Sequence, residues 1–382
     1  MCFRQPRTCC STTGRVKEGW LIMSVPRTPD SRLIHIQIKD FVKQILLDLS
    51  KGKLPSVSIS KYKICISFSQ HDRFRVFEET DNKETLRFQH SGSANRLVVM
   101  LRVLGIIQKL LEEGKHASKR DIYYTDVAIF RNVQAIDQAI NDICIYFHCS
   151  RHSLNVVSVS KGLVMGCLSY DDDGRRIDCM KYSCTGISVP VHTHLVRYIT
   201  SFAEYILLVE KETVFQRLAN DGYCRKNRCI VLSGKGYPDI ATRSFLRLLK
   251  EKLNLPVFAL VDGDPYGLDI LLTYKFGSLS MAYDAEVLVT PCIYWLGIHF
   301  SDCETFGVPK EFLLPLSRPD ERKASAILQK AYVKHYVPLW SKQVEIMLQL
   351  GVKLEIEAVA SVSLSFLAEC YLPSKIQNGS YL

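Results

Sequence analysis

Short apolar runs alternate with amphipathic segments in the middle of the chain. The apolar runs fall at residues 203–209, 229–232 and 256–261, and segments with helical spacing of apolar residues lie between them, at 213–218 and 246–253. Short apolar runs that alternate with helices are typical of a parallel sheet whose strands are joined by crossover helices. The pattern therefore predicts a parallel α/β sheet in this part of the chain.

Helical spacing dominates the first half of the chain. Apolar residues recur at helical intervals in residues 33–49, 96–111 and 135–147, and the second of these segments is apolar on most sides. Such a segment is expected to be buried. A polar, charged stretch at residues 69–93 predicts a loop or linker between the first two helices.

A hairpin pattern follows the third of these helices. Residues 155–159 and 163–168 are apolar runs on either side of the turn at Lys161-Gly162. Helix, turn, helix and hairpin is the order of a winged helix, whose second helix and wing usually face DNA. The alternative is a small α+β domain with solvated polar tips. The polar side chains available to DNA in this prediction are Arg151, His152, Asn155 and Lys161.

The last third of the chain predicts one more strand and a helical layer. Residues 286–290 form an apolar run that leads into Pro291, and helical spacing dominates from Asp320 onward. We expect these C-terminal helices to cover the sheet without taking part in chemistry.

Carboxylates follow two of the predicted parallel strands. Glu210 comes directly after the first run, and Asp262 and Asp264 come after the third. Because the carboxyl ends of parallel strands share one edge of a sheet, we expect these side chains to converge. Converging carboxylates repel one another and need a cation or protonation, and oxygen ligands alone suit Mg²⁺. The alternative is that Glu210 and Asp264 merely cap the helices that follow them.

A second candidate for chemistry is a pair of tyrosines behind two cations. Tyr123 and Tyr124 follow Lys119 and Arg120 at a spacing of four, which puts each cation on the same side as its tyrosine in a helix or a strand. A neighbouring cation favours the phenolate and neutralises a phosphate. Spacing alone does not choose between the two tyrosines, and the alternative is that both merely pack.

Charge and cysteine content narrow the class of protein. The chain has 382 residues, with 49 Lys and Arg against 39 Asp and Glu, so its net charge is +10. This excess is compatible with a polyanionic partner. No apolar stretch approaches the ~20 residues that span a bilayer, so no membrane partner is expected. The 14 cysteines form no dense framework, which favours reduced thiols over disulfides. The pairs Cys179/Cys184 and Cys224/Cys229 have no convincing His partners, which argues against structural zinc at these cysteines.

Four strings of residues carry a resemblance to a known family. They are KRDIYY at 119–124, VEK at 209–211, GKGYPD at 234–239 and VDGDPYG at 261–267. A Glu after one strand and Asp-x-Asp after a later one resemble a Toprim domain, the metal-binding fold of topoisomerases. Together the strings resemble the A subunit of topoisomerase VI and its eukaryotic meiotic relatives.

The resemblance implies a role for each candidate residue. Tyr124 would be the nucleophile of a type IIB topoisomerase-like DNA-cleaving transesterase, with Arg120 as its assisting cation. Glu210, Asp262 and Asp264 would hold Mg²⁺. The product would be a meiotic double-strand break with Tyr124 linked to the 5′ end. The implied location is the nucleus.

The resemblance also implies partners and leaves alternatives open. Double-stranded DNA would be the substrate. The chain would form a homodimer, or a heterodimer with a paralogous A-type chain, and would bind a topoisomerase VI B-like subunit. One alternative is the A subunit of a true ATP-dependent strand-passing topoisomerase VI. Another is a catalytically silent DNA-binding scaffold.

The expected architecture is a multidomain α/β and α+β protein. A winged-helix (CAP-like) cleavage domain would precede a Toprim parallel-sheet domain with a helical C-terminal layer. The expected divisions are a flexible extension (1–29), a helix and linker (30–93), the tyrosine-bearing domain (94–185) and the Toprim domain with its helices (195–382).

Overall fold

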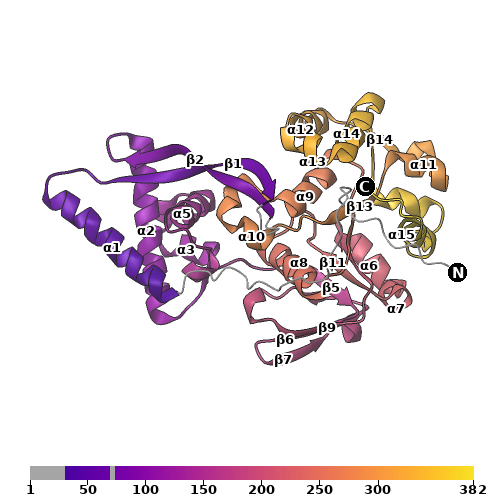
Figure 1. Cartoon of the computed structure of the whole chain (residues 1–382), viewed down its shortest axis with the longest axis horizontal. Coiled ribbons are helices and arrows are strands. Elements are labelled where there is room, and N and C mark those ends of the chain that lie inside the picture. Colours follow the sequence, from indigo (N-terminus) through magenta and orange to yellow (C-terminus); the bar gives the residue numbers. More distant parts are fainter. Residues whose placement is uncertain (1–30, 69–73) are drawn as a thin grey trace.

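The computed structural model describes residues 31–68 and 74–382 (Figure 1). The expected extension at residues 1–29 lies outside the described residues. Residues 31–157 form a mainly helical part, called here the helical body, and residues 163–382 form the sheet body. In the described residues, no helix is both long and apolar enough to cross a membrane.

Three helices and a hairpin surround the core of the helical body. The helices are α1 (Ser31–Ser50), α2 (Ser91–Glu113) and α5 (Val133–Tyr146). Their buried faces meet in one apolar cluster, to which α1 contributes Ile34 and Ile38 and α5 contributes Ile136 and Ile140. All three predicted helices are therefore confirmed.

The predicted loop at residues 69–93 is wrong over most of its length. β1 (Ser56–Phe68) and β2 (Phe74–Arg87) pair as a long antiparallel hairpin. Val76 and Leu86 of β2 are buried, whereas most of the remaining described residues of the strand are polar and exposed or half-buried. An antiparallel strand can keep one face in water. For that reason its composition resembled that of a loop.

A six-stranded sheet organises the second body. Its strand order is β13-β12-β10-β11-β5-β8, and β13, β12, β10 and β11 run parallel. The parallel α/β sheet predicted from the apolar runs is thus confirmed, with antiparallel strands added at one edge. The bounds are β5 (Leu163–Gly166), β8 (Ile187–Ser188), β10 (Tyr205–Val209), β11 (Cys229–Ser233), β12 (Val257–Leu260) and β13 (Ile293–Gly297).

Helices cover both faces of this sheet. Ile206 and Leu208 of β10 belong to one apolar cluster, and Leu207 and Val209 to another. Because neighbouring strand residues point to opposite faces, β10 lies at the centre of two cores. The first face is covered by α8 (Ile240–Leu253), α9 (Pro265–Phe276), α12 (Arg318–Leu328), α13 (Ala331–Tyr336) and α14 (Pro338–Leu350). The second is covered by α6 (Glu212–Asn220), α7 (Tyr223–Asn227) and α15 (Leu372–Gln377).

The C-terminal helical layer is confirmed, but the strand predicted at residues 286–290 is wrong. α10 (Ala285–Leu288) occupies that segment, and the sheet takes β13 instead. A short apolar run suits a buried strand and a buried helical turn equally well. Its neighbours decide between them.

The hairpin predicted around Lys161-Gly162 is also wrong. β4 (Val156–Val157) pairs with β3 (Ala117–Ser118) inside the helical body, whereas β5 pairs with β11 and β8 in the sheet body. The two halves of the expected hairpin therefore belong to different bodies. A further small sheet follows β5, made of β6 (Leu168–Asp172), β7 (Arg175–Asp178) and β9 (Arg197–Ser201). The winged-helix arrangement stays a prediction.

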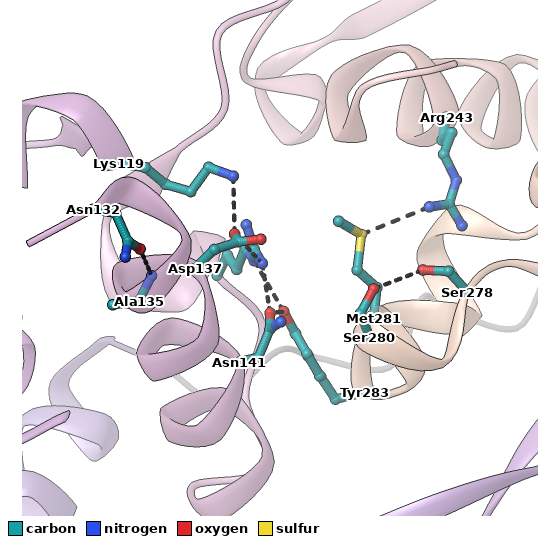
Figure 2. Close-up of polar contacts among 11 residues, drawn as sticks. Lys119, Asn132, Ala135, Asp137, Asn141, Arg243, Ser278, Ser280, Met281 and Tyr283 are labelled. Carbon is teal, nitrogen blue, oxygen red and sulfur yellow. Dashed lines mark hydrogen bonds and ion pairs between the residues drawn. The ribbon is translucent and has the colours of Figure 1, made fainter. Parts of the chain in front are cut away.

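A buried polar network joins the two bodies. The Arg151 guanidinium donates to Asn141 and to the Tyr283 hydroxyl, and it lies 2.9 Å from the Asp137 carboxylate. Lys119 donates to the same carboxylate at 2.9 Å. Figure 2 shows Lys119, Asp137 and Asn141 on one side and Tyr283 reaching them from the other. Because Asp137 and Asn141 belong to α5 and Tyr283 to the sheet body, the network fixes one body against the other.

This network corrects part of the predicted DNA-facing set. Arg151 is only 5% exposed and is fully engaged, so it does not face DNA. The Asn155 amide donates to the Lys115 carbonyl, and the Lys161 ammonium donates to the Lys235 carbonyl in the sheet body. Of that set, only the His152 side chain forms no hydrogen bond or ion pair within residues 31–68 and 74–382, and its ring lies against that of His194.

Candidate active site

The two tyrosines lie on a short helix whose start is fixed by its own residues. α3 (Lys119–Thr125) begins with a capping box, in which the Ser118 hydroxyl accepts from the Asp121 N–H and the Asp121 carboxylate accepts from the Ser118 N–H. Such a box satisfies two otherwise unpaired donors. With Ile122 buried in the core, Tyr124 is left 75% exposed.

The structure distinguishes the two tyrosine–cation pairs that spacing left open. The Tyr123 hydroxyl donates to the Arg131 carbonyl at 3.4 Å, and Lys119 is paired with Asp137. Within the described part of the chain, the side chains of Tyr124 and Arg120 form no hydrogen bond or ion pair, and both are exposed. Tyr124 and Arg120 are thus the pair that is free to meet a substrate.

The three predicted carboxylates lie at one edge of the sheet. β10 and β12 are adjacent and parallel, with Val209 opposite Leu260, so Glu210 and Asp262 follow their ends side by side. A Glu210 carboxylate oxygen accepts from the Asp262 N–H at 2.9 Å. Asp262 in turn accepts from the Ile356 N–H at 2.9 Å. The predicted convergence at the carboxyl ends of the strands is confirmed.

The capping alternative holds for one carboxylate and fails for another. Asp264 is the N-cap of α9 and accepts from the Gly267 N–H at 2.6 Å. Glu210 does not cap α6, whose N-cap is Lys211. Capping therefore explains the position of Asp264 but not that of Glu210.

These carboxylates are held where negative charge is unfavourable. Burial, followed by the nearby charge of Asp262, raises the pKa of Glu210 to about 8. Burial also raises the pKa of Asp262 to about 6, against the opposing effects of the Ile356 N–H and Lys211. The pKa of Asp264 is raised as well, again by burial first. The site therefore favours an added positive charge.

Lys211 supplies part of that charge, and sequence reasoning gave it no role. Its ammonium lies 3.1 Å from Asp262, 2.7 Å from Glu357 and 3.5 Å from Glu355. Burial would lower the pKa of Lys211, but the Glu357 hydrogen bond and the charge of Asp262 raise it overall. Its place directly after Glu210 was the only available signal, because Glu357 lies 146 residues downstream.

The donor set fits a hard divalent ion. All donors are carboxylate oxygens, and Mg²⁺ typically takes one or two carboxylates and keeps several waters. The three acids do not form a closed cage, because among the described residues only a group of histidines has three ligand atoms within 4.8 Å of one another. Glu210 and Asp262 are in direct contact, and burial together with the charge of Asp264 raises the pKa of both.

A glycine that sequence reasoning did not single out lets the loop after β12 approach the site. A Cβ on Gly267 would lie 2.5 Å from the Asp262 carbonyl oxygen and 3.1 Å from a Glu210 carboxylate oxygen. No side chain fits there without moving backbone atoms. The glycine ending the VDGDPYG string is thus a packing requirement of the carboxylate site.

The tyrosine and the carboxylates belong to different bodies. α3 packs on α5, α4 (Val127–Phe130) and β3, all within the helical body. Figure 1 shows α3 in the helical body, with α10 and α8 between it and the labelled strands β11 and β13 of the sheet. One chain therefore presents the two halves of a candidate active site on separate surfaces.

Matches to two known protein families identify the class of protein to which this chain belongs. Residues 205–376 match the Toprim domain of the family that joins the topoisomerase 6 A subunit with Spo11, and residues 95–156 match the family "Type IIB DNA topoisomerase". The first match covers the four parallel strands with the carboxylates, and the second covers most of α2, together with α5 and the tyrosine-bearing α3. Both halves of the site thus fall in segments of one protein class.

Individual relatives cover nearly the whole chain. "Meiotic recombination protein SPO11-1" of Arabidopsis thaliana is 50% identical over 341 residues, 89% of this chain and 94% of the relative. "Meiotic recombination protein SPO11" of Mus musculus is 36% identical over 360 residues, 93% and 90% of the two chains. The DNA topoisomerase 6 A subunit of Arabidopsis thaliana is 40% identical over 302 residues, 79% and 70%. The chain belongs to the topoisomerase VI A-type/Spo11 family, and the predicted Toprim domain is confirmed.

Proposed function

We propose that the chain is a topoisomerase VI A-like transesterase that makes meiotic DNA double-strand breaks. The observation that carries this is the exposed Tyr124 with Arg120 one helical turn before it, in a chain 50% identical to a meiotic recombination protein. The breaks would initiate homologous recombination, so the protein would act in the nucleus.

The reaction needs no external energy source. The Tyr124 oxygen attacks a backbone phosphorus and loses its proton, while the bond from phosphorus to the 3′ oxygen breaks and that oxygen takes up a proton. One phosphodiester bond is exchanged for a 5′-phosphotyrosyl bond. Arg120 neutralises the charge that develops on the phosphoryl oxygens.

The carboxylate site supports this exchange through a divalent ion, for which we propose Mg²⁺. When bound by Glu210, Asp262 and Asp264, Mg²⁺ would polarise the phosphate and stabilise the leaving 3′ oxygen. Lys211 holds Asp262 in place from the protein side. The buried carboxylates then gain the positive charge that their raised pKa values favour.

The separation of Tyr124 from the carboxylates favours an active site shared by two protomers. A double-strand break needs two nucleophiles, and a two-fold dimer matches the symmetry of duplex DNA. Tyr124 of one protomer would meet the carboxylates of the other. The partner would be a second copy or a paralogous A-type chain, and a B-like subunit would supply any ATP-driven step. The helical body would bind the duplex as a winged helix.

A covalent DNA adduct tests the nucleophile. With Mg²⁺ and partner subunits present, a labelled duplex should become linked to the chain in a form that resists detergent. Tyr124→Phe removes only an exposed hydroxyl, so it should abolish the adduct and leave folding and DNA binding unchanged. Tyr123→Phe is the matched control and should keep most of the activity. An adduct formed by Tyr124→Phe and lost in Tyr123→Phe would show that the nucleophile is Tyr123.

A mixed dimer of Tyr124→Phe with Glu210→Gln tests the sharing of sites. If sites are shared, the Tyr124 kept by the second protomer meets the intact carboxylates of the first, and one strand is nicked. If each site lies within one protomer, nothing is cut. Nicks from the mixture, with none from either variant alone, would support sharing, and an inert mixed dimer that still binds DNA would refute it.

A strand-passing topoisomerase VI is the second candidate, favoured by the 40% identity to a DNA topoisomerase 6 A subunit. Relaxation of supercoiled DNA by the chain together with ATP and a B-type subunit would establish it. Cleavage without resealing would support the meiotic role. A chain that binds DNA and forms no adduct under any of these conditions would be a silent scaffold.

A further inference from the structure

Four histidines that no proposed catalytic step uses gather at the junction of the two bodies. One available ring nitrogen from each of His152, His192 and His194 lies within 4.8 Å of the others. The rings of His152 and His194 are 3.9 Å apart between centroids, and those of His116 and His192 are 5.2 Å apart. His116 is thus a fourth ring at the edge of the group.

These histidines come from both bodies. His152 begins η1 (His152–Leu154), whose Leu154 is buried in the core of the helical body. His192 and His194 flank Thr193 at the start of η3 (Thr193–Leu195), where the Thr193 hydroxyl is 2.8 Å from the Ser244 hydroxyl on α8. Any ligand that binds all three rings therefore links the two bodies.

Among the described residues, the rings of the cluster have no acidic partner. In the described part of the chain, none of the four rings forms a hydrogen bond or an ion pair with a carboxylate. Neutral imidazoles with free lone pairs are the form that binds transition metals.

We propose that His152, His192 and His194 form a Zn²⁺-class metal site that staples the helical body to the sheet body. Tetrahedral zinc with bonds of about 2.0–2.1 Å needs nitrogens roughly 3.4 Å apart, so modest side-chain rotation closes the site. His116 or a water molecule takes the fourth position. Imidazole nitrogen suits Zn²⁺, whereas the carboxylates at the ends of β10 and β12 suit Mg²⁺, so the two sites are distinct.

A metal bound by these histidines would help to position the helix that carries Tyr124. His116 directly precedes β3, which pairs with β4 just after η1, and Ser118 of β3 caps the helix that carries Tyr124. Metal binding would therefore fix the base of α3 relative to the sheet body. The Arg151 network is a second link between the same bodies, so the fold itself does not depend on the metal.

Cobalt substitution of the metal-stripped full chain tests the site. Co²⁺ is added in the presence of excess Mg²⁺, which fills the carboxylates, after alkylation of the exposed thiols of Cys184, Cys292 and Cys370. We expect the visible spectrum of tetrahedral Co²⁺, bleached by Zn²⁺ and not by Mg²⁺. Zinc should also raise the melting temperature of the chain.

Substitution of the exposed His194 and the half-buried His152 tests whether these rings bind the Co²⁺. His194→Ala and His152→Ala should weaken Co²⁺ binding at least about 100-fold, because loss even of an outer-shell partner costs 10–100-fold. His90→Ala is the control, since His90 is exposed and lies outside the cluster. Circular dichroism at matched concentration shows whether each variant is folded. The proposal is overturned if the folded variants bind Co²⁺ as tightly as His90→Ala does, or if the unmodified chain gives no tetrahedral spectrum. Weaker DNA binding by the variants with unchanged Co²⁺ binding would also overturn it, in favour of a phosphate contact.

Discussion

Asp142 in the helical body and Asp262 at the sheet edge are both buried, but their charges are balanced in opposite ways. Asp142 in the helical body accepts two hydrogen bonds from Arg96, at 2.7 and 2.8 Å, and a third from Gln138. Asp262 in the sheet body has Lys211 at 3.1 Å and one N–H, but it also shares its edge with Glu210. Burial raises the pKa of Asp262 to about 6 and leaves its negative charge costly.

The difference separates a structural carboxylate from a functional one. A buried charge with a bidentate partner is satisfied by the chain itself. A buried group of carboxylates with too few cations nearby has its charge balanced only when a further cation or proton binds. We therefore expect opposite responses of the two bodies to loss of a carboxylate or its partner.

The largest effect should come from removing a carboxylate of the sheet edge. Asp262→Asn and Asp264→Asn should each slow cleavage about 100-fold or more, which is a rise of roughly 3 kcal/mol in the activation free energy, because each removes a proposed Mg²⁺ ligand. Without metal these variants should be as stable as the unchanged chain or slightly more stable, since repulsion is relieved. Adduct yield against Mg²⁺ concentration measures the first effect, and urea unfolding measures the second.

Glu251→Gln on the exposed face of α8 is the control for both measurements. Full cleavage by Asp264→Asn at unchanged Mg²⁺ would refute its role as a required ligand. A large loss of metal-free stability in Asp262→Asn would instead make Asp262 a structural residue like Asp142.

The next largest effect should be on the helical body. Arg96→Met leaves Asp142 buried without its cation and should lower the free energy of unfolding by roughly 3 kcal/mol. The double variant Arg96→Met with Asp142→Asn should regain part of this loss, because no unpaired charge remains. Urea unfolding of the three proteins measures both values. Equal stability of the single and double variants would contradict the contrast between the two bodies.

The last expected effect is the pH dependence of the metal-free chain. The pKa of Glu210 is raised in the folded chain to about 8, so the folded state binds its proton more tightly than the unfolded state does. Stability should therefore fall as pH rises from about 4.5 to about 8, where the folded carboxylate gives up its proton. Glu210→Gln should flatten this part of the profile, and saturating Mg²⁺ should restore stability at high pH. A profile unchanged by Glu210→Gln would show that Glu210 does not titrate in this range.

The sequence by itself determined the parallel strands, the positions of the three main helices and the convergence of Glu210, Asp262 and Asp264. These features follow from local rules. Strand and helix periodicity depends on near neighbours, and carboxyl ends of adjacent parallel strands must share an edge.

Only the tertiary structure decided the rest. The choice between the Lys119–Tyr123 and Arg120–Tyr124 pairs depends on Asp137, which engages Lys119 from another helix. The polar strand β2 and the transfer of β5 to the sheet body depend on distant pairing partners. The histidine cluster unites residues up to 78 positions apart, from His116 to His194. The periodicity of apolar residues cannot reveal such contacts, because it reports only on near neighbours. These contacts form between segments that lie far apart in the sequence.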